Sequence, residues 1–487
     1  MYEATWESVR THQVPQWYDD AKLGVFLHWG LYSVPGWAPQ VPDIQELLLH
    51  SGPKRMLWEN PYAEWYRNTM QLKGSPTWQH HRDTYGGAPY DNFVETFNDA
   101  SSGADLDALA DLCRRSGAGY VVLTTKHHEG FTLWPADTPH PTKGRYHARR
   151  DLVGDLSTAV RAAGLEMGLY YSGGYDWPYN DAIMRRPADA VLAVPTGRAY
   201  LDFVTAHVRE LIDRYQPTVL WNDIGWPSGG NLAELFAYYY NTVEDGVIND
   251  RWVESTLPRN RLADTALGLA GDLVQLAWRF IPENRKQLTF GGARHFDFRT
   301  PEYSQFDRIP SRKWESTRGV GHSFGANRNE RPEDIITPDA LIRLLCQVVS
   351  MNGNLLIGIG PAPDGTIPLE QQVPLRGLGT WMAQNREAIV GTRPWEMPTS
   401  STTDGTEVRF TQRDGHVYAL VFGRPGSATW TISRIEALAV TSVSLLGLAQ
   451  PLDASSVGGS LTITAPDQLQ EQAVYALDLG TDVRARL

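Results

Sequence analysis

The 487-residue sequence predicts an α/β protein, a (β/α)8-like barrel of the TIM type followed by a C-terminal antiparallel β-sandwich. Two observations predict this fold class. Up to about residue 390, short continuous apolar runs alternate with amphipathic helical stretches, which is typical of buried parallel strands joined by helices. Beyond that point the chain consists of short alternating segments separated by Gly, Asp, Pro and Ser, which is typical of antiparallel strands.

A chain of this length is too long for one ordinary core, so more than one domain is expected. We place a barrel domain at residues 1–392 and a β-sandwich domain at residues 393–487. The sandwich is predicted from six segments, which are "TEVRFTQ", "HVYALVFG", "ATWTIS", "SVSLLG", "LTITA" and "AVYALDL".

The predicted barrel strands end in polar or aromatic residues. The runs "LGVFLHWG", "GYVVLTTKHH", "EMGLYYS" and "PTVLWND" bring the chain to His28, to His127 and His128, to Tyr171 and to Asp223, and "NGNLLIGIGP" forms a later strand. In βα barrels, the functional residues gather at the carboxyl ends of the strands. We therefore expect these five side chains to surround one site.

Helices are predicted between the strands. The stretches "DLDALADLCRRSG", "DLVGDLSTAVRAAG" and "AYLDFVTAHVRELIDRY" repeat apolar residues with helical spacing, and the first two end at a Gly. The two cysteines, Cys113 and Cys346, lie far apart in apolar helical stretches, where a thiol behaves as a small buried hydrophobe. They therefore predict no disulfide framework and no metal site.

The composition excludes several classes of partner. A net charge of −12 without a Lys/Arg cluster argues against nucleic acid, because phosphate binding needs a basic surface. No apolar run is long enough to span a bilayer, so no membrane association is expected. The N-terminus lacks the apolar core and cleavage site of a signal peptide, which predicts a cytoplasmic location. The 17 Trp, 21 Tyr and 13 His suit sugar recognition, although aromatic residues also fill large cores.

The segment "VLWNDIGWP" places Asp223 after a buried strand, between Trp221 and Trp226. A carboxylate at a barrel strand end can attack an anomeric carbon, bind a metal or cap the next turn. Capping is common for Asp in general. The flanking tryptophans favour a functional role, because their rings exclude water and provide a platform for a sugar.

The adjacent histidines His127 and His128 in "TTKHHEGF" suggest a zinc site. Zinc takes three or four ligands at suitable spacing, and neither an HExxH motif nor a cysteine cluster is present. We therefore expect no metal and no cofactor, and we interpret the two rings as partners of substrate hydroxyls. For His127, bracing its neighbour is an equally good interpretation. For His28, at a strand tip, a ligand contact is favoured over a core position, whereas Trp29 is expected to pack.

Eight segments together resemble the α-L-fucosidases of glycoside hydrolase family 29, in its bacterial branch. They are "AKLGVFLHWGLYSVPGW", "EWY", "YVVLTTKHHEGF", "LWNDIGWP", "NDRW", "DFRTPEY", "WESTRGVGHSFGANRNE" and "NGNLLIGIGPAPDGTIP", in the order of the family, over roughly residues 15 to 390. The resemblance implies a barrel with a C-terminal β-sandwich. It also implies a retaining exo-α-L-fucosidase that cleaves terminal α-L-fucosides, in a fucosylated glycan or a small fucoside, through a covalent fucosyl-enzyme intermediate.

The resemblance also implies roles for individual residues. Asp223 matches the family nucleophile, and Phe324 matches an aromatic residue near the methyl group of the sugar. The other residues that match the fucose pocket are His28, Glu64, Trp65, His127, His128, Tyr171, Trp221 and Arg251.

Two glutamates match the family's acid/base. Glu302 in "DFRTPEY" resembles the acid/base of bacterial members, and Glu315 in "KWEST" resembles the one in other branches. The surrounding segments favour Glu302 over Glu315, and geometry has to decide between them.

An additional stretch at about residues 253–294 separates "NDRW" from "DFRTPEY", a connection that is short in close relatives. Its apolar part, "LVQLAWRFI", predicts a helix packed over one rim of the barrel. A neutral surface insertion is the simple interpretation. The functional alternatives are a lid or a contact in a homo-oligomer that shapes the leaving-group subsite.

Three other functions compete with fucoside hydrolysis. They are a fucose-binding lectin without catalysis, a glycosidase acting on α-L-galactosides, and a metal-dependent hydrolase that uses His127 and His128. Asp223 together with Glu302 and Glu315 favours a catalytic site over a lectin.

Overall fold

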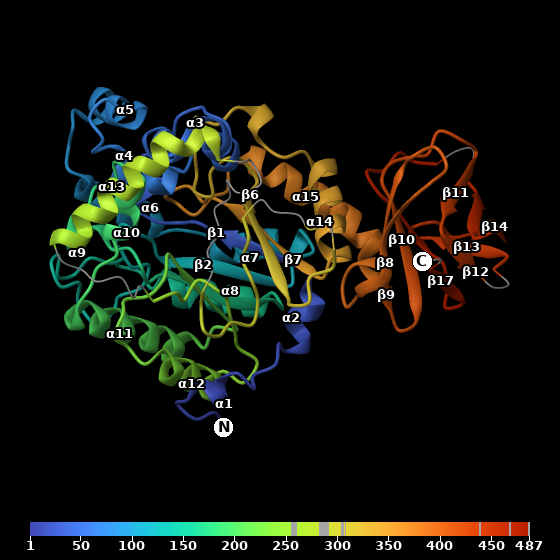
Figure 1. The fold of residues 1–487 in the computed structure, drawn as a ribbon, viewed down its shortest axis with the longest axis horizontal. Helices are drawn as coiled ribbons and strands as arrows, with labels where there is room; N and C mark the ends of the chain where they lie inside the picture. Colours follow the sequence, from blue (N-terminus) through green and yellow to red (C-terminus); the bar gives the residue numbers. More distant parts are fainter. Residues whose placement is uncertain are drawn as a thin grey trace.

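The computed structural model describes residues 1–254, 261–281, 292–302, 306, 308–437, 440–466 and 469–485. Its N-terminal part is built on a seven-stranded parallel sheet in the order β5-β4-β3-β2-β1-β7-β6 (Figure 1). The strands are β1 (Leu23–Leu27), β2 (Tyr120–Lys126), β3 (Glu166–Ser172), β4 (Val219–Asp223), β5 (Val247–Ile248), β6 (Trp314–Gly319) and β7 (Gly353–Ile359).

The five strands predicted from apolar runs are confirmed as β1, β2, β3, β4 and β7. The sequence patterns did not predict β5 or β6. β5 has only two residues, and β6 has the polar sequence "WESTRG", although almost all of it is buried. Inside the barrel, the carboxylate of Glu315 in this strand accepts hydrogen bonds from Tyr18, Tyr120 and Trp221.

Inward-pointing aromatic and aliphatic side chains fill the barrel. Successive residues of a strand point to opposite faces, so alternate residues of neighbouring strands meet in the interior. Tyr170 of β3 pairs with Trp221 of β4, and their rings stack with centroids 5.4 Å apart. The interior cluster of fully buried residues also includes Phe26, Tyr120, Val122, Val219, Val247, Phe298 and Leu356.

The segment from Phe298 to Glu302 lies between β5 and β6, where a regular barrel has its eighth strand. Asn249 forms a parallel bridge with Phe298, Arg299 forms one with Trp314, and Glu302 forms one with Thr317. These bridges link the two edges of the seven-stranded sheet. They also place Glu302 at the carboxyl end of the barrel, together with the ends of the other strands.

The predicted helices are confirmed as α7 (Leu106–Arg115), α8 (Leu152–Ala162) and α11 (Arg198–Tyr215), which cover the outside of the barrel. Side chains of Asp105 and Asp151 cap α7 and α8 by accepting hydrogen bonds from backbone N–H groups of the first turn. Cys113 in α7 and Cys346 in α14 (Pro338–Ser350) are buried free thiols. Among the described residues, no helix combines the length and apolar character that crossing a membrane requires.

Three further helices lie over the carboxyl end of the barrel (Figure 1). They are α3 (Ile44–Trp58), α10 (Pro187–Leu192) and α13 (Arg261–Ala277). A helix in the insertion is confirmed as α13, which packs against α10 and α3. The apolar run that predicted this packing is largely exposed, at Leu273, Val274, Leu276 and Phe280, so α13 packs through its other face. Residues 255–260 and 282–291 of the insertion lie outside the described residues.

Shorter helices and the helix that leads to the second sheet complete this part of the chain. They are α1 (Trp6–Val9), α2 (Gln16–Ala21), α4 (Tyr66–Thr69), α5 (Pro76–Tyr85), α6 (Phe93–Ser101), α9 (Trp177–Asn180), α12 (Leu232–Thr242) and α15 (Leu369–Asn385).

The C-terminal part is antiparallel, with an eight-stranded sheet in the order β11-β15-β14-β13-β16-β10-β9-β8 and a β12-β17 pair. A bridge between Thr402 and Ile432 brings the edges of the larger sheet together, which gives it a barrel-like form. The strands are β8 (Arg393–Ser401), β9 (Glu407–Arg413), β10 (His416–Val421), β11 (Thr429–Ser433), β12 (Ile435–Ala437), β13 (Ser442–Leu445), β14 (Leu452–Val457), β15 (Ser460–Thr464), β16 (Tyr475–Asp478) and β17 (Val483–Ala485).

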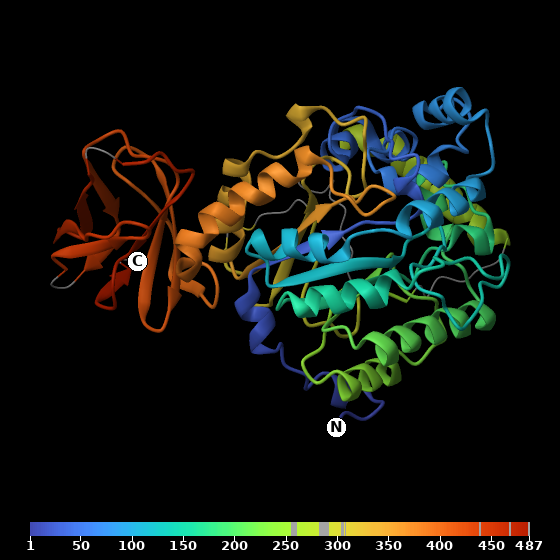
Figure 2. The same cartoon turned by 180° about the vertical axis from the view of Figure 1, so that it is seen from behind.

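The two parts share an apolar contact through α14 and α15 (Figure 2). Leu420 of β10 and Val474 belong to the same buried cluster as the helices around the barrel. Trp381 of α15 donates a hydrogen bond from Nε1 to the carbonyl of Val474, at 2.8 Å. The second sheet therefore covers apolar helix surface on the side of the barrel. The division of the chain into domains at 392/393 stays a prediction.

Gly24 in β1 is required by close packing inside the barrel. A Cβ added there would lie 2.4 Å from the ring of Tyr120. We expect Gly24→Ala to lower the free energy of unfolding by about 1–3 kcal/mol, because overpacking in a dense core forces neighbours to shift. Gly103→Ala is the matched control, since a Cβ there meets nothing within 4 Å. Chemical denaturation measures both, and equal stability of the two variants would contradict the close contact.

Candidate active site

A cavity of about 200 Å³ opens at the carboxyl end of the barrel strands. This volume lies below the roughly 300–1,000 Å³ of sites for drug-sized ligands, so it suits one small ring. Of the residues that the sequence singled out, those that line it are His28, Glu64, Trp65, His127, His128, Trp221, Asp223, Arg251, Glu302 and Phe324.

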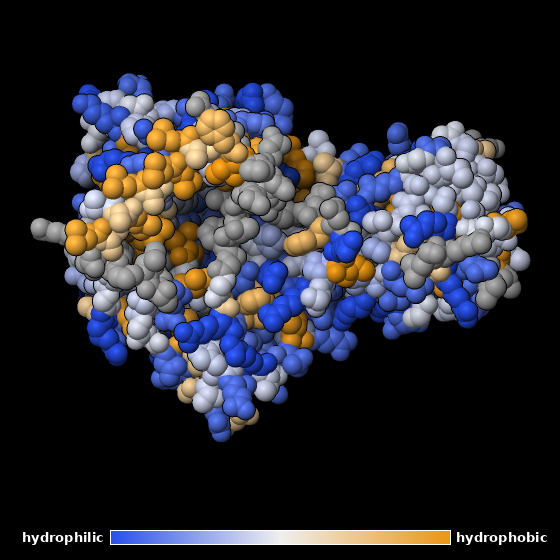
Figure 3. All heavy atoms as spheres, viewed as in Figure 1, coloured by the Kyte–Doolittle hydropathy of each residue, from blue (hydrophilic) through white to orange (hydrophobic). Residues whose placement is uncertain are grey.

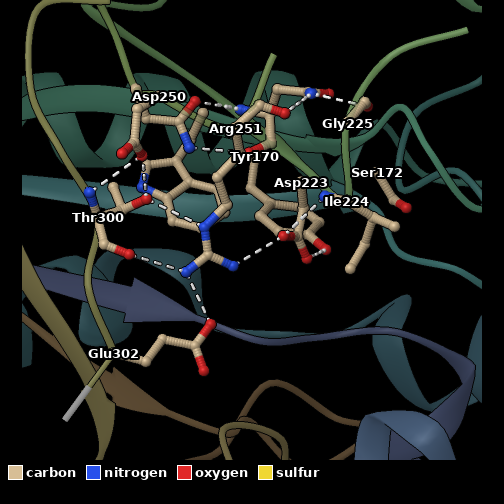
Figure 4. Close-up of polar contacts among 12 residues, drawn as sticks. Tyr170, Ser172, Asp223, Ile224, Gly225, Asp250, Arg251, Thr300 and Glu302 are labelled. Carbon is tan, nitrogen blue, oxygen red and sulfur yellow. Dashed lines mark hydrogen bonds and ion pairs between the residues drawn. The ribbon is translucent and has the colours of Figure 1, made fainter. Parts of the chain in front are cut away.

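Asp223 is the last residue of β4, and its side chain is held from three directions (Figure 4). Oδ1 accepts hydrogen bonds from Arg251, at 2.9 Å, and from the backbone N–H of Ile224, at 2.9 Å. Oδ2 accepts a hydrogen bond from the hydroxyl of Tyr170, at 2.8 Å. The side chain of Asp223 is 11% exposed, and this exposure faces the cavity. The carboxylate is therefore fixed in orientation and open to a ligand.

Arg251 joins Asp223 to Glu302 (Figure 4). One terminal nitrogen, Nη1, donates to Asp223, and the other, Nη2, donates to Glu302 at 2.7 Å. The guanidinium is oriented by Thr300, whose hydroxyl and carbonyl accept two more hydrogen bonds, and it lies 4.7 Å from the ring centroid of Trp221. The planar guanidinium presents its N–H donors in a fixed fork. A single guanidinium that binds both carboxylates therefore keeps them close together.

The charge of Arg251 is secured by the same contacts. Burial lowers the pKa of an arginine, but the carboxylates of Glu302 and Asp223 outweigh it and raise the pKa above its usual value. Arg251 is thus a permanent positive charge between two acids, within a site that is largely closed to water.

Glu315, the alternative acid, does not line the cavity. Its side chain lies inside the barrel below the cavity and is fully buried. Oε2 accepts hydrogen bonds from the hydroxyls of Tyr18 and Tyr120, and Oε1 accepts one from Nε1 of Trp221, at 3.1 Å. Burial raises the pKa of Glu315, and these three donors oppose that effect. Glu315 therefore supports the ring of Trp221 from beneath.

The histidines form a second wall of the cavity. The ring centroids of His127 and His128 lie 3.9 Å apart, and that of His28 lies 6.0 Å from that of His127. β2 ends at Lys126 after a shift in register, which lets two consecutive residues reach the same space. Burial lowers the pKa of His28 and of His128 to about 3, and lowers that of His127 well below its usual value.

The three rings are therefore neutral at neutral pH, and each has one nitrogen that donates and one that accepts. In the described part of the chain, the buried Nδ1 atoms of His28 and His127 have no hydrogen-bond partner. Sugar hydroxyls both donate and accept, so they match such rings. Among the described residues, no group of three or more His, Cys, Asp or Glu is arranged to hold a metal ion.

Glu64 and Phe324 meet next to the histidine wall of the cavity. Oε2 of Glu64 accepts hydrogen bonds from the backbone N–H of Gly325, at 2.9 Å, and from the hydroxyl of Ser323, at 3.2 Å. Burial raises the pKa of Glu64 to about 7. The ring of Phe324 lies 4.9 Å from that of His28, centroid to centroid. This side of the cavity therefore places one polar group beside an apolar ring.

Tyr171 was expected to line the site, but its side chain does not line the cavity. Its hydroxyl is paired with Nδ1 of His207 in α11, at 3.2 Å, and Lys126 lies over its ring, so it faces the outer helices. Tyr170 lines the cavity instead. The side chains of a strand alternate between the two faces, and an error of one residue reverses the assignment.

The family model for α-L-fucosidases matches residues 1–387. The chain is similar to the Thermotoga maritima α-fucosidase solved with a mechanism-based inhibitor (39% identity, TM-score 0.82, 98% of this chain and 100% of that one). It is similar to a T. maritima α-L-fucosynthase in complex with α-L-Fuc-(1-2)-β-L-Fuc azide (39% identity, TM-score 0.83, 98% and 99%). The α-L-fucosidase of Dictyostelium discoideum is 30% identical over 95% of this chain and 91% of its own.

The chain belongs to the α-L-fucosidase family. It is a glycoside hydrolase with α-L-fucosidase activity, and the resemblance that its sequence motifs indicated is confirmed. The fold of this fucosidase, a parallel barrel followed by an antiparallel C-terminal sheet, is confirmed as well.

Sequence patterns missed several residues in the cavity of this fucosidase. Tyr170 holds Asp223, and Tyr62 donates a hydrogen bond to Oε2 of Glu302, at 3.4 Å. Phe26, two residues before His28, lines the floor. Side chains alternate between the two faces of a strand, and applying this period of two residues could have identified Phe26 and Tyr170. Tyr62 lies in a loop, where no periodicity predicts the direction of a side chain.

Proposed function

We propose that this fucosidase cleaves terminal α-L-fucosides with retention of configuration, with Asp223 as the nucleophile and Glu302 as the acid/base. The observation that supports this assignment is the single guanidinium of Arg251, which holds both carboxylates on one cavity. Retaining glycosidases need their two carboxyl groups about 5–5.5 Å apart, whereas inverting enzymes leave room for a water molecule.

In the first step, an oxygen of Asp223 forms a bond to C1 of fucose, while the bond from C1 to the glycosidic oxygen breaks. Glu302, which must carry a proton at this stage, gives it to the departing oxygen. The ion pair between Glu302 and Arg251 has to loosen before this transfer. Arg251 and Tyr170 hold the carboxylate of Asp223 in a fixed orientation for the attack.

In the second step, water attacks C1 of the fucosyl ester and Glu302 takes its proton, which releases fucose and frees Asp223. Once Asp223 is esterified it has lost its negative charge, and Glu302 is then the carboxylate that remains beside Arg251. This arrangement suits Glu302 as a base. The other cavity residues bind fucose in this proposal, namely His28, Glu64, Trp65, His127, His128, Trp221 and Phe324.

Phe324 is proposed to contact the C5 methyl group of fucose. A hydroxymethyl group at that position would bring a hydroxyl against the ring of Phe324 and leave it without a partner. A single buried carbon discriminates only modestly, by about 10–200-fold, so the neutral histidines and Glu64 are expected to contribute most of the selectivity.

Replacing the nucleophile gives the first test. We expect Asp223→Gly to lower kcat/KM on an aryl α-L-fucoside by about 10⁴-fold or more, because no covalent intermediate forms. Azide should restore turnover and give β-L-fucosyl azide, identified by NMR. Asp245→Gly, at an exposed site outside the cavity, is the control and should retain activity. Substantial activity of Asp223→Gly without azide would show that the nucleophile is another residue.

The acid/base is tested by varying the leaving group. Glu302→Ala should lower kcat/KM about 100-fold or more on an alkyl fucoside, whose departing oxygen needs a proton, and much less on an activated aryl fucoside. With azide, this variant should form α-L-fucosyl azide. Glu315→Gln should show the same ratio of aryl to alkyl rates as the unaltered protein. The opposite pattern, with the ratio changed in Glu315→Gln alone, would assign the acid to Glu315.

A further inference from the structure

The cavity has an apolar wall that the proposed fucose site does not use. Six lining residues come from α3, from the loop after β3, from α10 and from the residue after Asp223; they are Ile44, Met56, Leu57, Tyr175, Ala190 and Ile224. Five of them, together with Trp65, pack in one apolar cluster that is distinct from the barrel interior; the sixth, Ile44, belongs to α3.

The wall and the proposed acid/base line the same cavity. Tyr62, four residues beyond the end of α3, donates a hydrogen bond to Glu302. Ile224 lies directly after the proposed nucleophile, and its backbone N–H binds Asp223. In the proposed function the polar residues at the strand ends bind fucose, so the part of the cavity lined by α3 and α10 is left for the leaving group.

The insertion helix α13 holds these two elements together. Arg186, at the start of α10, forms an ion pair with Asp272 of α13, at 2.9 Å. Gln275 of α13 accepts a hydrogen bond from the N–H of Lys54 in α3, and Nε1 of Trp278 donates to the carbonyl of Leu48, both at 2.8 Å. Gly52, where α3 kinks, packs against Trp278. The insertion therefore fixes the position of the apolar wall.

We infer that the leaving-group subsite of this fucosidase is apolar and prefers alkyl or aryl aglycones to a hydrophilic sugar. The inference rests on the proposed function, because Glu302 marks the side on which the aglycone leaves. Burying a methylene against such a wall is favourable, whereas each sugar hydroxyl placed there would lose its hydrogen bonds to water.

The test compares hexyl and methyl α-L-fucosides, whose leaving alcohols have similar acidity. We expect kcat/KM to be at least tenfold higher for the hexyl fucoside, and higher for it than for a fucosyl disaccharide. Met56→Gln should reduce the hexyl-to-methyl ratio about fivefold. Leu369→Gln, at an exposed position on α15, is the matched control and should leave the ratio unchanged.

The possible results distinguish a failure of the apolar subsite from a failure of the proposed mechanism. Equal rates on hexyl and methyl fucosides, or a preference for the disaccharide, would overturn the apolar subsite while leaving fucoside hydrolysis intact. An unchanged ratio in Met56→Gln would also overturn it. Cleavage with inversion of configuration would instead overturn the proposed mechanism.

A second observation concerns the outer face of α13. Four leucines of α13, Leu262, Leu269, Leu273 and Leu276, and Phe280 in the 3-10 turn that follows are 62–84% exposed. They form an apolar surface beside α3 and α10 (Figure 3). With Ala266 they are spaced four and three residues apart in turn, which is the seam of a coiled coil. An ordinary amphipathic helix would turn such a face toward its own core.

Small residues line one flank of this seam. Ala263, Ala270 and Ala277 follow Leu262, Leu269 and Leu276 at intervals of seven, and their small side chains suit the close approach of a second helix. On the other flank, Asp272 is already paired with Arg186. With Val274, the exposed apolar side chains amount to roughly 800 Å², taking about 200 Å² for each whole side chain, which is what one partner contributes to a stable interface.

We propose that a second copy of this chain covers the α13 seam, with the two helices antiparallel about a twofold axis. In a twofold interface the same surface of both copies meets itself in the opposite direction. A seam with evenly repeated leucines fits this requirement, because its spacing is the same when it is read in either direction. Each copy would then stiffen α13, and through it the wall made by α3 and α10.

Sedimentation of the full-length protein tests this proposal. We expect a dimer at micromolar concentration, and a monomer for the double variant Leu269→Glu with Leu276→Glu. The control, Leu369→Glu with Val373→Glu on α15, should remain dimeric. Ala270→Cys should cross-link two copies under oxidation, since both natural cysteines are buried. A monomeric unaltered protein, or a dimer that survives the α13 substitutions, would overturn the proposal.

Discussion

The site depends on one ion-pair arrangement, in which Arg251 lies between Asp223 and Glu302. Two carboxylates that line one small, largely buried cavity repel each other. The buried guanidinium of Arg251, which is itself held by Thr300, offsets this repulsion. The rest of the barrel's carboxyl end can be understood as support for this group. Trp221 stacks beneath it, and Glu315 holds Trp221 in place from inside the barrel.

The segment that closes the barrel serves the same arrangement. Between β5 and β6, the residues from Phe298 to Glu302 bridge the sheet without forming a full strand. Residues two apart in extended backbone point to the same face, so Thr300 and Glu302 both reach Arg251, while Phe298 packs in the barrel interior.

The insertion joins the catalytic end of the barrel to the surface of the molecule. One face of α13 packs against α3 and α10, which supply the apolar wall of the cavity. The opposite face exposes leucines at the spacing of a helix–helix seam. A single helix can thus couple the shape of the substrate cavity to an external contact, because α-helices transmit position along their length as rigid elements.

The sequence by itself determined the five apolar strands, the outer helices, Asp223 and the histidines, because burial imposes continuous apolar runs and strand ends mark the functional edge. It could not find β6, a polar but buried strand in which Glu315 is paired with Tyr18, Tyr120 and Trp221 from distant parts of the chain. It misplaced Tyr171 by one residue, since the face of a strand is set by its register with its neighbours. Only the tertiary structure decided between Glu302 and Glu315 as the glutamate that faces the cavity. Both are acids in similar motifs, and what separates them is which one meets Arg251 at the cavity and which one meets Tyr18 and Tyr120 inside the barrel.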